Sequence, residues 1–339
     1  MNKINKLLNE EYVIKFFKEK ILEKYSSFSK IKKVKIIKHK KYIWEETYHV
    51  VFEFRTYFLT KEGKVKIIPI FCSAHSGEPR KNTYYALQYL WNSGFSKGFL
   101  TTPHPLFYSN YFKGMFYRGV DGKNLYHYIK NNDFEEIERM IPKAASWLVK
   151  LHKTSINEAS NFNKENSRIK TVFPGIKHIL REIEENFPEY YDFYKKAYKK
   201  FIDSEKEFLK ISKNITLIHG DAHPENFIKM GRKKIAMIDF TDISLSDFAR
   251  DLGCFLQQFE FMAMRKIGDS KYVEKIKNIF LEKYLEDAKI KMDDSLEKRI
   301  NIYYNWTAIR TATYFLLKYD AEPERGKSLI ESVKENLNL

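Results

Sequence analysis

The sequence predicts an α+β fold in two lobes, a small β-rich lobe over residues 1–114 and a large, mainly helical lobe over residues 115–339. Two observations support this prediction. In the first third of the chain, runs of β-branched and aromatic residues between turn signals indicate strands. From about residue 124, apolar residues recur every three or four positions, which is the period of an amphipathic helix.

The N-terminal lobe is expected to hold a leading helix, an antiparallel sheet and one further helix. A hairpin is predicted where two strand-like runs flank the turn sequence KEGK at 61–64. Pro79 favours the first turn of a helix, because its missing N–H is not needed there. The predicted elements are a helix over 9–25, strands over 33–38, 47–60 and 65–72, a helix beginning near Pro79, and β structure over 105–118.

The C-terminal lobe is expected to be helical except for two short apolar runs. ITLI (215–218) and KIAMIDF (234–240) each indicate a strand, and KMGRKK (229–234) is the turn predicted to join them into a hairpin. Helical patterns, each with one apolar face, occupy the rest of the lobe. They cover residues 134–151, 175–210, 248–265, 270–288 and 296–318.

The composition limits the class of protein. The formal net charge is +16, which suits either an anionic partner or a general bias toward lysine, since the lysines are spread over the whole chain. No interleaved aromatic and basic motif is present, so nucleic acid is not expected as a partner. The N-terminus has no signal-peptide pattern and no apolar run is long enough to span a membrane. Cys72 and Cys254 are expected to be free and buried, as in a reducing cytoplasm.

A polar cluster interrupts the helical lobe at LIHGDAHPENFI, residues 217–228. Buried polar groups need partners, so such a cluster is either an exposed turn or a working site. Asp221 is followed five residues later by Asn226, and the next strand-like run ends at Asp239. Phosphoryl transfer uses one carboxylate to orient the attacking hydroxyl and an amide and a second carboxylate to hold Mg²⁺. The order and spacing of the three side chains fit this chemistry.

At these residues the chain resembles the aminoglycoside phosphotransferase and choline kinase family, whose members share the protein-kinase-like fold. The shared motifs are HGDAHPEN (219–226) and MIDFTDISLSDFARDLGCF (237–255), and the resemblance extends to AASWLVKLHKTS (144–155) and FYRGVDGKNL (116–125). The family resemblance covers about residues 105–262 with good motifs. It implies a bilobal kinase-like fold, ATP and Mg²⁺ as cofactors, and a small hydroxylated molecule as acceptor.

The resemblance also implies roles for individual residues. Asp221 would be the catalytic base, and Asn226 and Asp239 would be Mg²⁺ ligands. His219 would brace the loop, where it also fits the role of a hydrogen-bonded core histidine, and Asp251 would fasten the loop through backbone N–H groups. The simpler alternative for the Asp221 and Asn226 pair is a polar turn.

The nucleotide-binding half of the family pattern is less complete here. The first glycine of the chain is Gly63, so no glycine-rich phosphate loop precedes the hairpin, and the usual strand lysine has no clear counterpart. Lys66 on the second hairpin strand is the candidate replacement, with Arg80 and Lys81 at the helix start as further candidates; each also fits a solvated basic residue. In the segment that resembles the hinge, Met115 and Tyr117 are expected to contact the nucleotide.

The sequence therefore predicts an ATP- and Mg²⁺-dependent phosphotransferase that acts on a hydroxyl group of a small molecule. The alternative is a pseudokinase or nucleotide-binding scaffold without efficient catalysis. A helical face carrying Tyr303, Trp306, Arg310 and Tyr314 fits either an acceptor pocket or a packed core. The segment DFTD (239–242) and Glu260 add carboxylates that would suit a cationic acceptor. Choline, ethanolamine, an aminoglycoside, another sugar and an amino-acid hydroxyl all remain possible.

Overall fold

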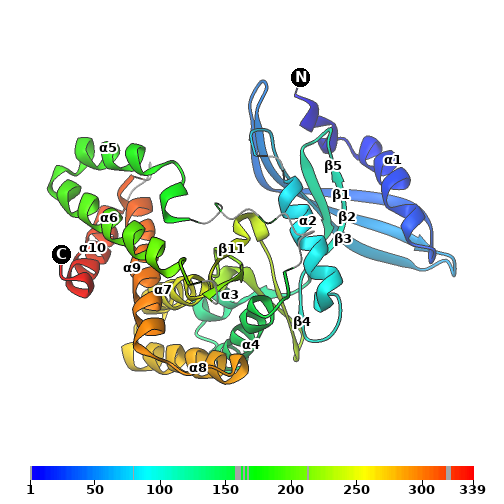
Figure 1. Ribbon diagram of the computed structural model, residues 1–339. Helices are drawn as coiled ribbons and strands as arrows, with labels where there is room; N and C mark the ends of the chain where they lie inside the picture. The colour runs from blue at the N-terminus through cyan, green and yellow to red at the C-terminus, as the bar shows by residue number, and fades with distance from the viewer. Residues whose placement is uncertain are drawn as a thin grey trace. The chain divides into compact units, whose positions relative to one another are not determined.

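The computed structural model describes residues 2–78, 80–156, 162, 165, 168–211, 214–317 and 322–339. The chain forms two compact units, each drawn in Figure 1. Unit 1 runs to Gly122 and also contains Met230–Thr241, and unit 2 consists of Lys123–Lys229 and Asp242–Leu339. These units differ from the predicted division after residue 114, because the strand that begins there belongs to the N-terminal sheet.

Unit 1 is built on a five-stranded antiparallel sheet in the order β1-β2-β3-β6-β5. The strands are β1 (Phe28–Ile43), β2 (Tyr48–Thr60), β3 (Val65–His75), β5 (His104–Ser109) and β6 (Gly114–Arg118). The predicted hairpin is β2 with β3, and Gly63 in its turn has a φ of 80°, which glycine adopts without strain. The register pairs Phe71 of β3 with both Glu53 of β2 and Tyr117 of β6, so these three side chains share one face.

Helix α1 (Glu10–Lys20) covers the other face of this sheet, as Figure 1 shows. Its Phe17 ring lies 5.3 Å from Phe54 of β2 in an edge-to-face arrangement, and Phe16 lies 5.6 Å from Phe116 of β6. Such pairs of aromatic rings stabilise a core beyond the area they bury. Ile68, Ile70, Cys72 and Ala74 of β3 belong to the same core. The even-numbered residues of β3 therefore face α1, and the odd-numbered residues face away from it.

The remainder of unit 1 follows the sheet. Helix α2 (Lys81–Leu90) packs against β5 and β6 and continues into an irregular turn, Trp91–Phe95. The short strand β4 (Leu100–Thr101) pairs in parallel with β10 (Lys234–Met237). This pairing explains why the segment Met230–Thr241, distant in sequence, belongs to unit 1.

Unit 2 is mainly helical. Its helices are α3 (Leu125–Lys130), α4 (Phe134–His152), α5 (Ile176–Asn186), α6 (Tyr191–Phe208), α7 (Ala249–Lys266), α8 (Ser270–Ala288), α9 (Asp294–Leu317) and α10 (Pro323–Leu337). The helices α7 and α9 pack closely, because a Cβ at Gly253 of α7 would lie only 2.6 Å from the backbone nitrogen of Tyr304 of α9. Helices α3 and α10 are not among the predicted elements; α3 is short and falls between the patterns that indicated helix.

Unit 2 also contains strands, and here the predicted hairpin is wrong. Strand β8 (Ile215–Ile218) pairs antiparallel with β11 (Ser244–Asp247), not with β10. The turn at Gly231–Lys233 instead joins β9 (Phe227–Met230) to β10, and β9 pairs with β7 (Lys123–Asn124). Strand periodicity identified these runs, but it carries no information on which partner each one takes.

Both cysteines are free and buried, as the sequence predicts. Among the helices within the described ranges, none combines the length and the apolar character that crossing a membrane requires.

Candidate active site

The loop His219–Asn226 follows strand β8 in unit 2 and carries most of the predicted catalytic residues. Gly220 has a φ of 82°, a conformation that glycine adopts without strain and that turns the chain sharply at the end of the strand. His219 is completely buried, and its Nδ1 atom lies 3.3 Å from the backbone nitrogen of Asp221. The strand end and this turn hold Asp221 at the edge of the β8–β11 pair.

Asp251, in the first turn of α7, fastens the start of this loop. Its buried carboxylate accepts the backbone N–H groups of His219 at 2.7 Å and of Gly220 at 2.8 Å. Nε2 of His152, at the end of α4, lies 3.0 Å from the same carboxylate. Burial raises the pKa of Asp251, but the hydrogen bond and charge of His152, with further contributions from His219, outweigh it and hold the pKa below its usual value. From the sequence, His152 is expected only to be a helix-packing histidine, because its place at a helix end carries no signal for a bond to Asp251.

Asp221 is held in its ionised form. Its side chain is 33% exposed, and its Oδ2 atom lies 3.4 Å from Nε2 of His223. Partial burial raises the pKa of Asp221, but the hydrogen bond and charge of His223 and the charges of Arg310 and His219 outweigh this effect. The pKa therefore lies well below its usual value. An ionised carboxylate can accept a hydrogen bond from a hydroxyl group and later its proton.

Asn226 lies close to Asp221, in the short 3₁₀ turn Pro224–Asn226. Its side-chain amide donates to the backbone carbonyl of Asp221 at 2.9 Å, and only 5% of the residue is exposed. This hydrogen bond uses the side-chain nitrogen, so the Oδ1 atom of Asn226 could coordinate a metal ion. The structure thus brings Asp221, Asn226, His219 and Asp251 together in unit 2.

Asp239 lies in unit 1, just after β10, and its side chain is exposed. Its φ of 60° is in the left-handed region, which Asp and Asn tolerate better than other non-glycine residues. Thr241 donates its hydroxyl to Oδ1 of Asp239 at 2.7 Å. Burial, with the negative charge of Asp239, raises the pKa of Tyr117. Asp239 and Tyr117, both predicted site residues, thus belong to the same unit.

A cavity of about 310 Å³ opens beside Asp221 in unit 2. Helices α7 and α9 supply most of its walls. Of the helical face singled out in the sequence, Arg310 and Tyr314 line this cavity, whereas Tyr303 and Trp306 are buried in the core. The lining residues are Asp221, His223, Glu225, Cys254, Gln258, Phe261, Met262, Thr307, Arg310, Thr311, Tyr314 and Phe315.

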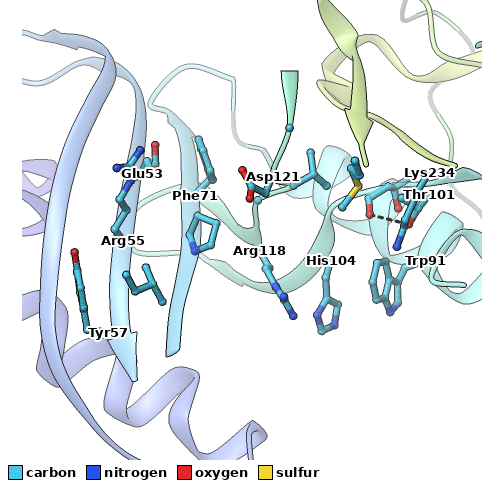
Figure 2. A pocket seen from close by; sticks show the side chains of 17 residues that line it. Glu53, Arg55, Tyr57, Phe71, Trp91, Thr101, His104, Arg118, Asp121 and Lys234 are labelled. Carbon is cyan, nitrogen blue, oxygen red and sulfur yellow. Dashed lines mark hydrogen bonds and ion pairs between the residues drawn. The ribbon is translucent and has the colours of Figure 1, made fainter. Parts of the chain in front are cut away.

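A second cavity, of about 820 Å³, lies in unit 1 on the sheet face that points away from α1. Figure 2 shows Glu53, Arg55 and Phe71 along one side and Trp91, Thr101 and His104 along the other. The segment Arg118–Gly122 crosses between them. This arrangement combines aromatic surface, backbone polar groups and cations in one concave site.

Phe71 and Glu53 are held rigidly in this cavity. The Phe71 ring stacks between His39, at 5.5 Å, and Tyr117, at 5.6 Å. The carboxylate of Glu53 accepts from Nε of Arg55 at 2.7 Å and lies 2.8 Å from Nε2 of His39. Burial raises the pKa of Glu53, but these two partners outweigh it and lower the pKa. Glu53 therefore stays ionised and orients Arg55.

The three predicted nucleotide-binding residues are placed differently from one another. Tyr117 and Met115 lie on the cavity face of the sheet, and Tyr117 stacks on the cavity residue Phe71, although neither lines the cavity itself. Lys66 is exposed on β3 but, as an even-numbered residue, points to the opposite face. Strand alternation therefore keeps Lys66 away from the cavity.

The two further candidates for the missing positive charge also differ. Arg80 is 7% exposed and has Glu78 as its side-chain partner at 3.4 Å, whereas Lys81 lies over the ring of Tyr85 at the surface. The cations that do line the cavity are Arg55, Arg118 and Lys234. None of these three stands out in the sequence, because only the fold brings them to one face.

Comparisons with known proteins identify the fold. A sequence model of the phosphotransferase enzyme family matches residues 47–285. No curated protein matches the chain significantly. Among solved structures, a spectinomycin phosphotransferase, APH(9)-Ia, in complex with ADP and spectinomycin is 15% identical, with a TM-score of 0.59 over 98% of this chain and 99% of that one.

Two other solved structures are similar. A choline kinase from Cryptosporidium parvum is 13% identical, with a TM-score of 0.62 over 97% of this chain and 95% of that one. An ethanolamine kinase from Plasmodium vivax is 15% identical, with a TM-score of 0.61 over 95% and 86%. At this identity the likeness concerns the fold, and it confirms the predicted class, with an antiparallel-sheet N-terminal region and a helical C-terminal region.

Proposed function

The chain belongs to the phosphotransferase enzyme family, and we propose that it transfers the γ-phosphate of ATP to a hydroxyl group of a small molecule. One observation carries the proposal: the ionised carboxylate of Asp221 lines a cavity large enough for a small acceptor. Ligand sites of this kind have volumes of about 300–1,000 Å³. The two buried free cysteines suit a reducing compartment, so we place the reaction in the cytoplasm.

In this proposal, Asp221 orients the acceptor hydroxyl and receives its proton late in the reaction. A phosphoryl transition state is loose, so positioning contributes more than a strong base would. A low pKa suits that role, because the carboxylate stays ionised and ready to accept a hydrogen bond. His219 and Asp251 hold the loop in place and do not contact the acceptor.

Asn226 and Asp239 would hold Mg²⁺, which neutralises phosphate charge when bound. Their chemistry fits this ion. Mg²⁺ takes oxygen ligands, often only one or two from the protein, and here an amide oxygen and an exposed carboxylate are offered. The order of these residues in the chain matches that of kinases, in which a catalytic-loop Asn and the Asp after the next strand bind the metal.

The cavity of unit 1 would bind the nucleotide. Phe71, whose two faces are covered by His39 and Tyr117, offers its ring edge to the base. The segment Arg118–Gly122, which resembles a hinge, offers backbone groups. Arg55, Arg118 and Lys234 would attract the phosphates. Tyr117 and Met115 would act behind this surface, as support for Phe71.

One observation favours the alternative, a nucleotide-binding protein without efficient catalysis. The cavity face of β3 carries Ile67, Pro69, Phe71, Ser73 and His75, so the strand offers no lysine to the phosphates. ATP consumption with Mg²⁺ across a panel of hydroxylated metabolites separates the two functions. Nucleotide binding, measured calorimetrically, is expected under both.

The decisive comparison is wild type against Asp221→Asn, with Asp203→Asn as a matched control on the exposed surface of α6. We expect Asp221→Asn to lower kcat by roughly 10²–10⁴ while ATP affinity changes little. Asp203→Asn should match wild type. Equal and substantial turnover in Asp221→Asn would remove Asp221 from the reaction, and negligible wild-type turnover with every acceptor would favour the scaffold.

A further inference from the structure

Arg310 on α9 lines the same cavity as Asp221, and no hydrogen bond or ion pair to its side chain occurs in the part of the chain that the structure describes. Arg299, on the same helix, is buried and paired with Asp247. Arg310 is near enough to Asp221 to lower its pKa, yet the two do not form an ion pair. The guanidinium is therefore available to a ligand.

The two carboxylates of the cavity are already directed toward a different residue. Asp221 lies 3.4 Å from Nε2 of His223, and Glu225 lies 3.9 Å from Nδ1 of the same ring. The charges that face the cavity are thus Asp221, Glu225 and His223 on the loop and Arg310 on α9. Of these four residues, Arg310 carries a positive charge that is not paired with either carboxylate.

The uncharged polar groups of the cavity are engaged within the protein. Thr307 donates its hydroxyl to the carbonyl of Tyr303 at 2.8 Å, and Thr311 donates to the carbonyl of Thr307 at 2.9 Å. The side-chain amide of Gln258 donates to Thr311 at 2.7 Å. The rest of the wall is formed by Cys254, Phe261, Met262 and Phe315, together with Tyr314. Arg310 is accordingly the strongest hydrogen-bond donor that this wall offers.

We propose that the acceptor is an anion, a hydroxylated compound whose carboxylate binds Arg310 while its hydroxyl meets Asp221. This inference rests on the proposed function. The planar guanidinium matches a carboxylate with two parallel hydrogen bonds, and such charge-assisted bonds are stronger than neutral ones. A cationic acceptor would be repelled by Arg310. Glu260, a carboxylate that would suit a cationic acceptor, is instead paired with Lys277 at 2.5 Å and does not line this cavity.

The transfer itself is unchanged by this choice of acceptor. The hydroxyl oxygen forms a bond to the γ-phosphorus, and the bond from that phosphorus to the bridging oxygen of ADP breaks. ADP leaves with the electron pair, and the hydroxyl proton passes to Asp221. The acceptor carboxylate takes no part in bond making and serves to position the molecule.

The test compares sugars of equal size that differ in charge: glucuronate, glucose and glucosamine, with glycerate, glycerol and ethanolamine as a smaller set. Binding is measured by ligand-observed NMR and transfer by ATP consumption, in wild type and in Arg310→Gln. Lys298→Gln, an exposed position on the same helix outside the cavity, removes the same charge as a control. We expect the anion of each set to bind roughly 10- to 100-fold better than its neutral counterpart, and Arg310→Gln but not Lys298→Gln to abolish that preference.

Three results would overturn the anionic acceptor while leaving the phosphotransferase intact. In the first, wild type binds the neutral or cationic member of a set more tightly than the anion, or binds all members equally. Alternatively, the preference for the anion would survive in Arg310→Gln. Finally, Arg310→Gln would lower turnover by the same factor for every acceptor, which would show that Arg310 acts only through the pKa of Asp221. Failure of the proposed function is distinct, because it appears as absent Mg²⁺-dependent transfer even where acceptors bind.

Discussion

Nε2 of His152 lies 3.0 Å from Oδ2 of Asp251 in the interior of unit 2, joining the end of α4 to the start of α7. The other ring nitrogen of His152 lies 2.7 Å from the hydroxyl of Tyr284 on α8. An ionised carboxylate can only accept, so Nε2 carries the hydrogen in this pair. Three helices therefore converge on the carboxylate that holds His219 and Gly220, one residue before Asp221.

Asp251→Asn should destabilise unit 2. The new side-chain NH₂ would face backbone N–H donors in a site without water access, and we expect the free energy of unfolding to fall by about 2–4 kcal/mol. Urea denaturation measures this as a lower midpoint at unchanged slope. Asp269→Asn is the matched control, because Asn caps helix α8 as well as Asp does. Equal stability of the two variants would contradict a fastening role for Asp251.

Asp239→Asn should weaken metal-dependent turnover without disturbing the fold. Asn tolerates the left-handed conformation at this position at least as well as Asp, so the variant removes charge and leaves the backbone unstrained. We expect the Mg²⁺ concentration for half-maximal ATP consumption to rise at least about tenfold, with the thermal midpoint unchanged. A charged ligand to a bound cation is worth at least this factor. Unchanged Mg²⁺ dependence, equal to that of Asp203→Asn, would exclude Asp239 from the metal site.

Phe71→Ala should weaken nucleotide binding. An edge contact between an aromatic ring and a base contributes about 0.5–1.5 kcal/mol, so the Kd for ATP should rise roughly 2- to 10-fold. Calorimetric titration measures it, and Phe99→Ala, at an exposed position in unit 1 outside the cavity, is the control. If ATP bound to both variants with wild-type affinity, the nucleotide would have to bind elsewhere.

His49 should make stability depend on pH. Burial, together with Lys40, Arg80 and the neighbouring His75, lowers the pKa of His49 to about 4. Between pH 6.5 and 4 the unfolded chain takes up a proton that the folded protein does not, so stability falls as the pH decreases through this window. Because the ring is partly exposed, we expect a contribution of about 1 kcal/mol, below the full linkage value.

The comparison that isolates this effect is urea unfolding of wild type and His49→Gln at pH 7 and pH 4.5. The variant should lose less stability on acidification than wild type does. His178→Gln, at an exposed position on α5, should retain the wild-type dependence. A wild-type slope in His49→Gln would assign the acid sensitivity to other groups.

Gly253→Ala should be destabilising even though Ala is the better helix former. The added methyl group would meet the backbone of α9 at 2.6 Å from the nitrogen of Tyr304, which cannot give way without moving the helix. We expect a net loss of about 1–3 kcal/mol in the free energy of unfolding. Gly326→Ala is the matched comparison. The added methyl group there would lie 2.8 Å from Cγ of Leu316 and 3.0 Å from the backbone oxygen of Ala312, whereas at Gly253 the three nearest atoms are all backbone and all within 2.8 Å, so the loss at Gly326 should be smaller. Stabilisation by Gly253→Ala would mean that α7 and α9 are not closely packed.

The sequence by itself determined the elements and the catalytic motif. The β2–β3 hairpin, the amphipathic helix α4 and the order of Asp221, Asn226 and Asp239 all follow from local patterns, because side-chain period and turn chemistry act within a few residues. The fold class and the family follow from the same patterns together. Helix α10 lay outside the predicted elements, and strand β8 was assigned the wrong partner, since period alone does not choose between strands that are equally apolar.

Only the tertiary structure decided which distant residues meet. His152 and Asp251 are joined by the packing of α4 on α7, and Arg310 reaches the cavity of Asp221 because α9 packs closely on α7 at Gly253. Lys66, by contrast, is a predicted site residue that the fold keeps away from the cavity. The even-numbered residues of β3 pack in the core beneath α1, so Lys66 lies on the face opposite the cavity. Burial and pairing between elements select these contacts, and such long-range terms leave no periodic trace in the sequence.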